Sequence, residues 1–86
     1  MATVRLTSLL RPLAGGLSLV QASGTTLRAV IDDLDRQYPG LRDRIIDAGA
    51  IRPDVMLAVG SDEVSDLNVA VASDAEVHIL PAIAGG

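Results

Sequence analysis

The 86-residue sequence contains no cysteine, lysine, tryptophan or phenylalanine, and Tyr38 is its one aromatic residue. Without cysteine, neither disulfide bonds nor thiol chemistry is available. The core must be aliphatic, and hydrophobic residues supply 49% of the chain. No apolar run approaches the roughly 20 residues that a membrane span needs, and residues 1–6 have the pattern of a strand and not of a secretory signal. We expect one cytoplasmic domain without a membrane segment.

The basic residues are few and all are arginine, and the formal net charge is −4. A protein that binds nucleic acid needs a basic face to displace counterions from the phosphates. The charge therefore argues against a general role in nucleic-acid binding.

Sets of residues that could bind a metal or a phosphate are also missing. His78 is the single histidine, so a metal site lacks a second histidine or a cysteine at ligand spacing. Asp32, Asp33 and Asp35 fall within a predicted helix in which Asp33 and Asp35 point in different directions, and this favours a solvated face over a cation site. Gly15-Gly16 has no GK[ST] after it and does not predict a phosphate-binding loop. We predict no catalytic residue and no bound metal.

The first half of the chain predicts a hairpin followed by a helix. Residues 2–9 and 17–22 have strand patterns, and residues 11–16 between them have turn composition. Ser23, Thr25 and Thr26 are candidate helix caps. The apolar stripe of the helix has the i, i+3, i+4, i+7 spacing of one helical face. Its members are Leu27, Val30, Ile31 and Leu34, and Pro39-Gly40 ends the helix.

The second half predicts short elements and a returning strand. Residues 41–46 form a helical turn with Leu41, Ile45 and Ile46 facing inward, and residues 47–53 form a loop. A strand covers 55–59, a turn covers 60–63, and Val64 begins a short edge strand. Residues 67–71 are irregular, 73–75 form a turn and 76–80 form the last strand. Pro81 ends that strand because proline has no N–H to donate.

This order of elements predicts an α+β fold, a mixed sheet with one main helix packed across one face. We expect one domain over residues 1–80 and a flexible C-terminal tail over residues 81–86. The tail reads Pro81-Ala82-Ile83-Ala84-Gly85-Gly86.

The whole-chain pattern and this tail resemble the ubiquitin-like β-grasp sulfur carriers of the MoaD/ThiS family. The most specific part is an apolar strand, a proline, an apolar spacer and a final Gly-Gly. Further matching features are Leu10-Arg11-Pro12 leading to Gly15-Gly16, Ala22-Ser23-Gly24 before the helix, and the Asp74 turn. Together they look closest to the cysteine-biosynthesis carriers. The sequence departs from the commoner pattern at Gly60-Ser61-Asp62, where many relatives have an Asn-containing turn.

The resemblance implies a carrier that is a protein cosubstrate and not an enzyme. An E1-like adenylyltransferase/sulfurtransferase would use ATP to adenylate the Gly86 carboxylate, and a sulfur source would then displace AMP to leave a thiocarboxylate. The carrier itself would bind no cofactor and would be a monomer when free. The sulfur-accepting enzyme would be a cysteine synthase, which the tail similarity favours, the large subunit of molybdopterin synthase, or a thiazole- or thiosugar-type synthase of thiamine or specialised metabolism.

The resemblance also implies where partners bind. Gly85 and Gly86 lack a Cβ and fit a narrow channel, Pro81 starts the tail in an extended direction, and Ala82, Ile83 and Ala84 supply apolar contacts. A candidate partner-contact face lies on the side of the sheet away from the helix. Its members are Arg5, Thr7, Met56, Ala58, His78 and Leu80. The alternative is that Met56 and Leu80 complete the core.

Two other function classes stay open. The chain could be a ubiquitin-like modifier that joins Gly86 to lysines of other proteins. Because it has no lysine side chain, it could not itself accept further copies through ordinary isopeptide bonds. It could also be an interaction domain with an inert tail.

Overall fold

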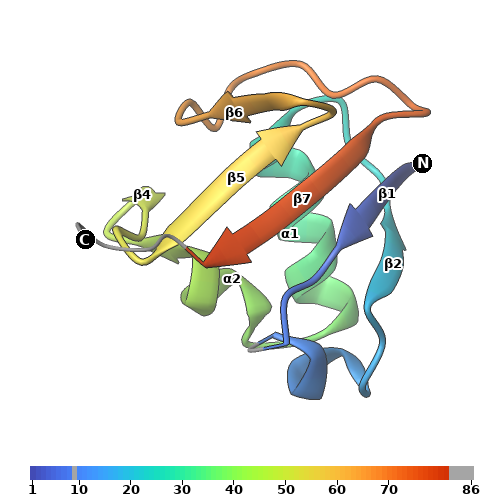
Figure 1. The fold of residues 1–86 in the computed structure, drawn as a ribbon, viewed down its shortest axis with the longest axis vertical. Coiled ribbons are helices and arrows are strands. Elements are labelled where there is room, and N and C mark those ends of the chain that lie inside the picture. Colours follow the sequence, from blue (N-terminus) through green and yellow to red (C-terminus); the bar gives the residue numbers. More distant parts are fainter. Residues whose placement is uncertain (9, 82–86) are drawn as a thin grey trace.

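The computed structural model describes residues 1–8 and 10–81 (Figure 1). Its elements are β1 (Ala2–Arg5), the 3-10 helix η1 (Arg11–Ala14), β2 (Leu19–Ala22), α1 (Leu27–Gln37), α2 (Leu41–Ile45), β3 (Ile46–Asp47), β4 (Ala50–Ile51), β5 (Val55–Val59), β6 (Asp62–Val64) and β7 (Glu76–Pro81). The predicted order of a hairpin, one main helix, short elements and a returning strand is confirmed.

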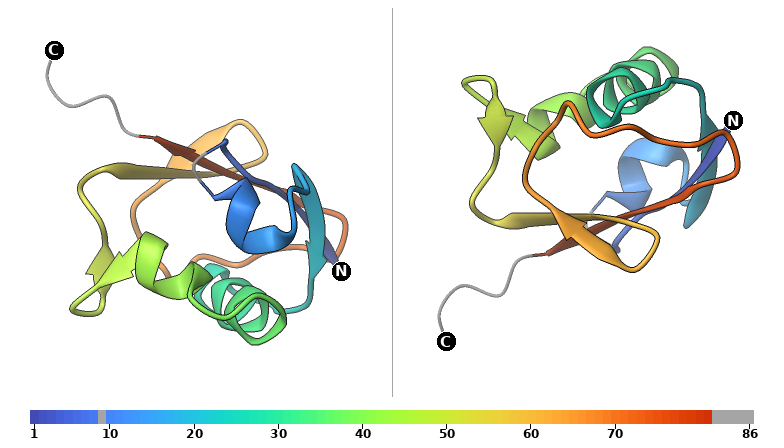
Figure 2. Two further views of the ribbon diagram at one scale, coloured as in Figure 1. Left: turned by 90° about the horizontal axis from the view of Figure 1, so that it is seen from below. Right: turned by 90° about the horizontal axis from the view of Figure 1, so that it is seen from above.

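Five strands form one mixed sheet in the order β2-β1-β7-β5-β6. β7 lies at its centre, parallel to β1 and antiparallel to β5. Both helices and η1 lie on one side of this sheet, and its opposite face is left open by the described elements (Figure 2). The predicted mixed sheet with a helix across one face is therefore confirmed.

The core lies between the sheet and α1. Alternate residues of the strands point into it, so Val4, Val77 and Ile79 are 1% exposed or less. The four apolar residues of the predicted α1 stripe are equally buried, and the three residues predicted to face inward from 41–46 are buried too. The side chain of Leu6 is buried beyond the end of β1, which stops at Arg5 and not at residue 9.

The start of α1 is held by a segment far along the chain. The Thr26 side chain accepts a hydrogen bond from the Ala29 N–H at 3.2 Å, as the cap prediction requires. The N–H groups of Leu27 and Arg28 donate to the carbonyls of Val69 and Leu67 at 3.0 and 2.8 Å. Residues 67–71 are irregular as predicted, and they satisfy helical N–H groups that would otherwise lack partners.

The predicted loop over residues 47–53 is wrong in part. β3 and β4 form a two-stranded ribbon in which Asp47 pairs with Ala50. The two residues between them, Ala48 and Gly49, have φ values of 52° and 81°. Positive φ at both central residues is what a type I′ hairpin turn requires. Alanine rarely adopts this conformation, so the sequence carries no strong turn signal here.

Three smaller differences concern boundaries. Residues 11–14 form a 3-10 helix where a turn was expected, and Gly15 ends it in the left-handed conformation with φ of 66°. β6 begins at Asp62, two residues before Val64. β7 includes Pro81, which is paired in register with Val55. Proline lacks an N–H for pairing, and it is tolerated at this last position because β1 pairs with β7 only as far as His78.

Across the described ranges, neither of the helices combines the length and the apolarity that crossing a membrane would require.

Candidate functional site

The candidate site is built around the end of β7. Pro81 is the last described residue, and it is exposed at the end of the central strand. The other tail residues predicted to carry the function, 82–86, lie outside the described residues. The structure therefore places the root of the tail and leaves the predicted role of Gly86 a prediction.

The predicted partner-contact face exists as one side of the sheet. The register places Arg5 and Ala58 on either side of His78, and Met56 beside Leu80. These five residues alternate with buried neighbours, so they share the face that the helices leave open. Leu80 is 38% exposed and Leu19, in the edge strand β2, is 45% exposed. Leu80 does not complete the core, contrary to the alternative, and Met56 is only half-buried.

Thr7 is the exception among the residues predicted for this face. It follows β1 and lines a pocket at the end of the sheet. The prediction extended the alternation of the strand past its true end at Arg5.

Three charged or polar side chains meet in the middle of the open face. The Arg5 Nε–H donates to Glu76 Oε1 in an ion pair, and His78 Nε2 lies 3.3 Å from the same oxygen. The hydrogen bond from Arg5 holds the pKa of the Glu76 carboxyl below its usual value. Sequence reasoning missed Glu76 because the parallel pairing of β1 with β7, which brings it beside Arg5, joins residues 71 positions apart. The face therefore combines exposed apolar side chains with a central charge cluster.

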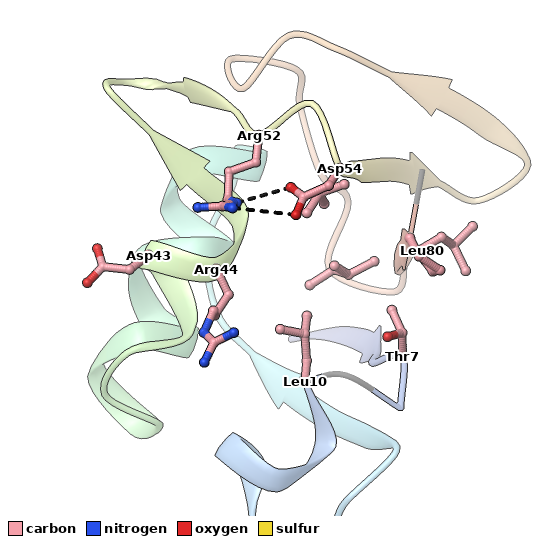
Figure 3. Close-up of a pocket in the computed structure, with 10 residues that line it drawn as sticks. Thr7, Leu10, Asp43, Arg44, Arg52, Asp54 and Leu80 are labelled. Atoms are coloured by element: carbon pink, nitrogen blue, oxygen red, sulfur yellow. Dashed lines mark hydrogen bonds and ion pairs between the residues drawn. The ribbon is translucent and has the colours of Figure 1, made fainter. Parts of the chain in front are cut away.

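A pocket of about 320 Å³ opens beside Pro81 (Figure 3). Leu10 and Ile79, which are 6% and 1% exposed, form its apolar floor. The remaining lining residues come from four separate parts of the chain. They are Thr7, Asp43, Arg44, Arg52, Asp54, Val55, Leu80 and Pro81. No local sequence pattern could have predicted this pocket.

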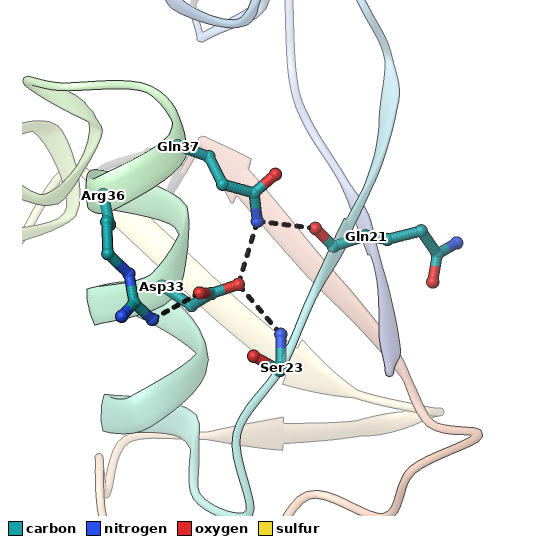
Figure 4. A network of polar contacts seen from close by, with 5 residues as sticks. All are labelled: Gln21, Ser23, Asp33, Arg36 and Gln37. Carbon is teal, nitrogen blue, oxygen red and sulfur yellow. Dashed lines mark hydrogen bonds and ion pairs between the residues drawn. The ribbon is translucent and has the colours of Figure 1, made fainter.

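The prediction that Asp32, Asp33 and Asp35 form a solvated face is wrong for Asp33, which is only 8% exposed (Figure 4). Its carboxylate accepts hydrogen bonds from the Ser23 N–H at 2.9 Å, from Arg36 at 2.6 Å and from Gln37 at 2.8 Å. The Ser23 N–H above all, and then Arg36, lower the pKa of Asp33. The position of Asp33 in the helix does not predict this burial, because Ser23, which donates to it, lies ten residues earlier, directly after β2.

This network has a structural role. The same Gln37 amide also donates to the Gln21 carbonyl at 2.9 Å (Figure 4). Side chains of α1 thus bind backbone groups on the outer edge of β2, where an unpaired edge would otherwise invite pairing with another chain.

Among the described side chains, no group of three or more histidine, aspartate or glutamate residues is arranged to hold a metal ion. This arrangement is suited to recognition of a partner: an open sheet face and a pocket both lie beside Pro81, the root of the tail.

Comparison with known proteins agrees with this arrangement. The ThiS family model matches residues 4–86. The chain is 41% identical over 90 residues to the sulfur carrier protein CysO of Mycobacterium tuberculosis and to its namesake in Mycobacterium bovis, with 98% of this chain and 97% of each relative covered.

Solved structures agree as well. The crystal structure of Mycobacterium tuberculosis CysO, an antigen, matches with a TM-score of 0.92 and 37% identity, covering 96% of this chain and all of that one. A chain of the Amycolatopsis orientalis BexX/CysO complex matches with a TM-score of 0.93 and 29% identity over all of both chains. The predicted ubiquitin-like β-grasp fold is confirmed, and the protein belongs to the ThiS family.

Proposed function

We propose that this chain is a sulfur carrier protein whose reactive group is the Gly86 carboxylate. The observation that carries the proposal is the near-full-length match, at 41% identity, to a protein named as a sulfur carrier. The position of Pro81 supports it, since the root of the tail lies exposed at the end of the central strand of the sheet. The scaffold then serves to present one chain end.

The proposed chemistry proceeds in two steps. A Gly86 carboxylate oxygen attacks the α-phosphorus of ATP, which forms an acyl-adenylate and releases pyrophosphate. A sulfur nucleophile then attacks the carbonyl carbon, and the bond to AMP breaks with AMP leaving. With hydrosulfide as the nucleophile, loss of its proton leaves a C-terminal thiocarboxylate directly. With a persulfide, a thiol must also cleave the S–S bond that joins the carrier to the donor, which releases the thiocarboxylate and a disulfide. Because a free carboxylate is a poor electrophile, the adenylate supplies the leaving group that sulfur attack needs.

The catalytic groups for both steps would reside on partners. In this proposal the chain is a cosubstrate, it binds no cofactor, and ATP is bound by an E1-like adenylyltransferase/sulfurtransferase. A sulfur-accepting enzyme then uses the thiocarboxylate. The match to a chain solved in a BexX/CysO complex supports recognition of a second protein. The free chain would be a monomer in the cytoplasm, where ATP is available, and its charge of −4 disfavours nucleic acid as a partner.

For the acceptor we propose an enzyme of cysteine biosynthesis. The support is the likeness in sequence and fold to proteins named CysO. A molybdopterin synthase large subunit and a thiazole- or thiosugar-type synthase are the competing acceptors, and each would be identified by which purified enzyme consumes the thiocarboxylate.

The partner-contact face is proposed to be the open side of the sheet. Exposed Leu80 and half-buried Met56 provide adaptable apolar contact, and Arg5 with Glu76 and His78 would fix the orientation by charge. The tail residues 81–86 would enter the partner's active site.

The test is an intact-mass measurement after incubation with the E1-like enzyme, ATP and a sulfur donor. Replacement of one terminal oxygen by sulfur supports the carrier. Covalent adducts between Gly86 and other proteins would instead identify a modifier. An unchanged mass, with an enzyme shown to be active on another carrier, would contradict both.

Two tail variants locate the reaction. Deletion of Gly86, or Gly85→Val, should abolish the mass change while leaving the thermal unfolding curve unchanged, because the sheet, the helices and the core are all formed by residues 2–81. A matched control is Gly60→Val, which lies in the turn before β6, where φ is +63°. It should lower the melting temperature and leave activation intact at temperatures where the chain is folded.

A further inference from the structure

The pocket beside Pro81 has an apolar floor and a charged rim. Leu10 and Ile79 close its base, and Val55 lies at its side. At about 320 Å³ it has room for a large aliphatic or aromatic side chain. Nothing in the chemistry of the proposed sulfur transfer uses this pocket, since that chemistry takes place on Gly86.

The rim holds two arginines with different electrostatic states. Arg52 is neutralised by Asp54, with its Nε 3.0 Å from Oδ1 and its Nη2 3.4 Å from Oδ2. Arg44, in α2, is exposed and makes no hydrogen bond or ion pair through its side chain with residues 1–8 or 10–81. Figure 3 shows the Asp43 carboxylate pointing away from Leu10, while Arg44 lies on the side nearer to it. Among the described residues, the Arg44 guanidinium therefore has no counter-ion, and it lies beside an apolar cavity.

The pocket is continuous with the surfaces proposed to meet partners. Leu80 belongs both to the open sheet face and to the pocket lining, and Pro81 is the root of the tail. The five residues from 82 to 86 reach at most about 17 Å when fully extended. An enzyme that encloses the Gly86 carboxylate must therefore come close to this pocket.

We propose that the pocket is a recognition site for the activating enzyme, which inserts an apolar side chain next to a carboxylate that pairs with Arg44. The apolar floor fits the first group and the free guanidinium fits the second. The activating enzyme is the first protein that must enclose the Gly86 carboxylate, because every molecule of the carrier meets it before any sulfur is transferred. This inference rests on the proposed function, because it assumes that such an enzyme binds the chain.

The first test measures the affinity of the full-length chain for its E1-like enzyme. Arg44→Glu should raise Kd about tenfold at low ionic strength, as loss of a close interfacial charge pair does. The effect should shrink with added salt, which screens a charge pair at the rim. The matched control is Arg28→Glu, the same charge change at a half-buried residue of α1 outside the pocket, and its Kd should stay within about twofold of wild type.

The second test uses the absence of cysteine from the chain. Arg44→Cys and Arg28→Cys each introduce a single thiol whose rate of maleimide labelling reports coverage. Excess activating enzyme should slow the labelling of residue 44 several-fold and leave that of residue 28 unchanged. Equal protection of both thiols, or of neither, overturns the proposal, as does an unchanged Kd for Arg44→Glu.

Measuring adenylation of the wild-type chain distinguishes failure of the pocket proposal from failure of the proposed carrier function. If the wild-type chain is adenylated but Arg44→Glu binds equally well, the pocket proposal fails and the carrier function stands. If the active enzyme does not adenylate the wild-type chain, both fail. A nitroxide at residue 44 of the free chain whose spectrum changes when the Gly86 carboxylate is amidated would assign the pocket to the chain's own end, and this too overturns the proposal.

Discussion

Along β7, the buried side chains of Val77 and Ile79 alternate with His78 and Leu80, which face the open side of the sheet. The first pair is 1% exposed, whereas Leu80 is 38% exposed although it is as apolar as Ile79. The two faces are built from the same strands, and both carry apolar side chains, although only the open face also carries the Arg5–Glu76–His78 cluster. The difference shows that apolar composition alone does not identify the core: α1 covers one face, and the other keeps its leucines available for contact.

The largest effect expected from this comparison is on the covered face. Leu27→Ala removes a fully buried side chain of α1 and should lower the free energy of unfolding by about 2–5 kcal/mol, through lost burial and the cavity left behind. Urea denaturation followed by circular dichroism measures it. The control Leu19→Ala, on the open face and 45% exposed, should cost less than about 1 kcal/mol. Equal losses would mean that the two faces do not differ as described.

A second prediction concerns how α1 is fixed against the end of β2. A Cβ on Gly24 would lie 2.7 Å from the Val30 nitrogen and 2.8 Å from the Ala29 carbonyl carbon, and its φ is +148°. Gly24→Ala should therefore destabilise the fold by about 3 kcal/mol, because backbone atoms of the helix must shift. Gly60→Ala is the matched control, with φ of +63° and no atom within 4 Å of the added Cβ. It should cost about 1 kcal/mol from backbone strain alone.

On the open face the order of effects should reverse. Leu80→Ala should change the unfolding free energy by less than about 1 kcal/mol, yet weaken binding to the activating enzyme by about 1–2 kcal/mol, as an apolar contact at an interface centre does. Calorimetric titration gives the second value and thermal unfolding the first. A large loss of stability with unchanged affinity would return Leu80 to the core, as the alternative held.

What the sequence predicts, and what it does not, follows the range of the interactions involved. The α1 stripe and the alternation of β7 are local repeats, so the pattern of residues alone places Leu27 and Ile79 inward, and both are buried. The open face also follows from alternation, except at Thr7, where the strand has already ended.

Apart from errors in element boundaries, the failures depend on contacts between distant segments or on unusual backbone angles. Asp33 is buried because Ser23 donates to it from the end of β2. The β3–β4 ribbon turns at Ala48 with φ of 52°, which alanine seldom adopts. The pocket beside Pro81 joins Leu10, which precedes η1, to α2, β5 and β7, and no sequence pattern indicates that Arg44 lies at its rim.

The smallest expected effect tests the polar network behind the covered face through pH. The pKa of Asp33 lies below its ordinary value of 3.8, owing first to the Ser23 N–H and then to Arg36. A carboxyl with a lowered folded-state pKa contributes stability that is complete above the unfolded pKa and is lost as pH falls through the folded one. Wild type should thus lose stability on acidification below about pH 4, and Asp33→Asn should lose less.

At neutral pH Asp33→Asn should be the less stable chain, and the gap should close as the wild-type carboxylate is protonated. Some slope should remain in the variant, because Glu76 and Asp54 also have lowered pKa values, held by Arg5 and Arg52. Asp62→Asn serves as the control, since its exposed side chain makes no hydrogen bond or ion pair within residues 1–8 and 10–81. If both variants follow the wild-type curve between pH 7 and pH 3, the network adds no charge-dependent stability, and burial of Asp33 must be maintained by the packing of β2 against α1.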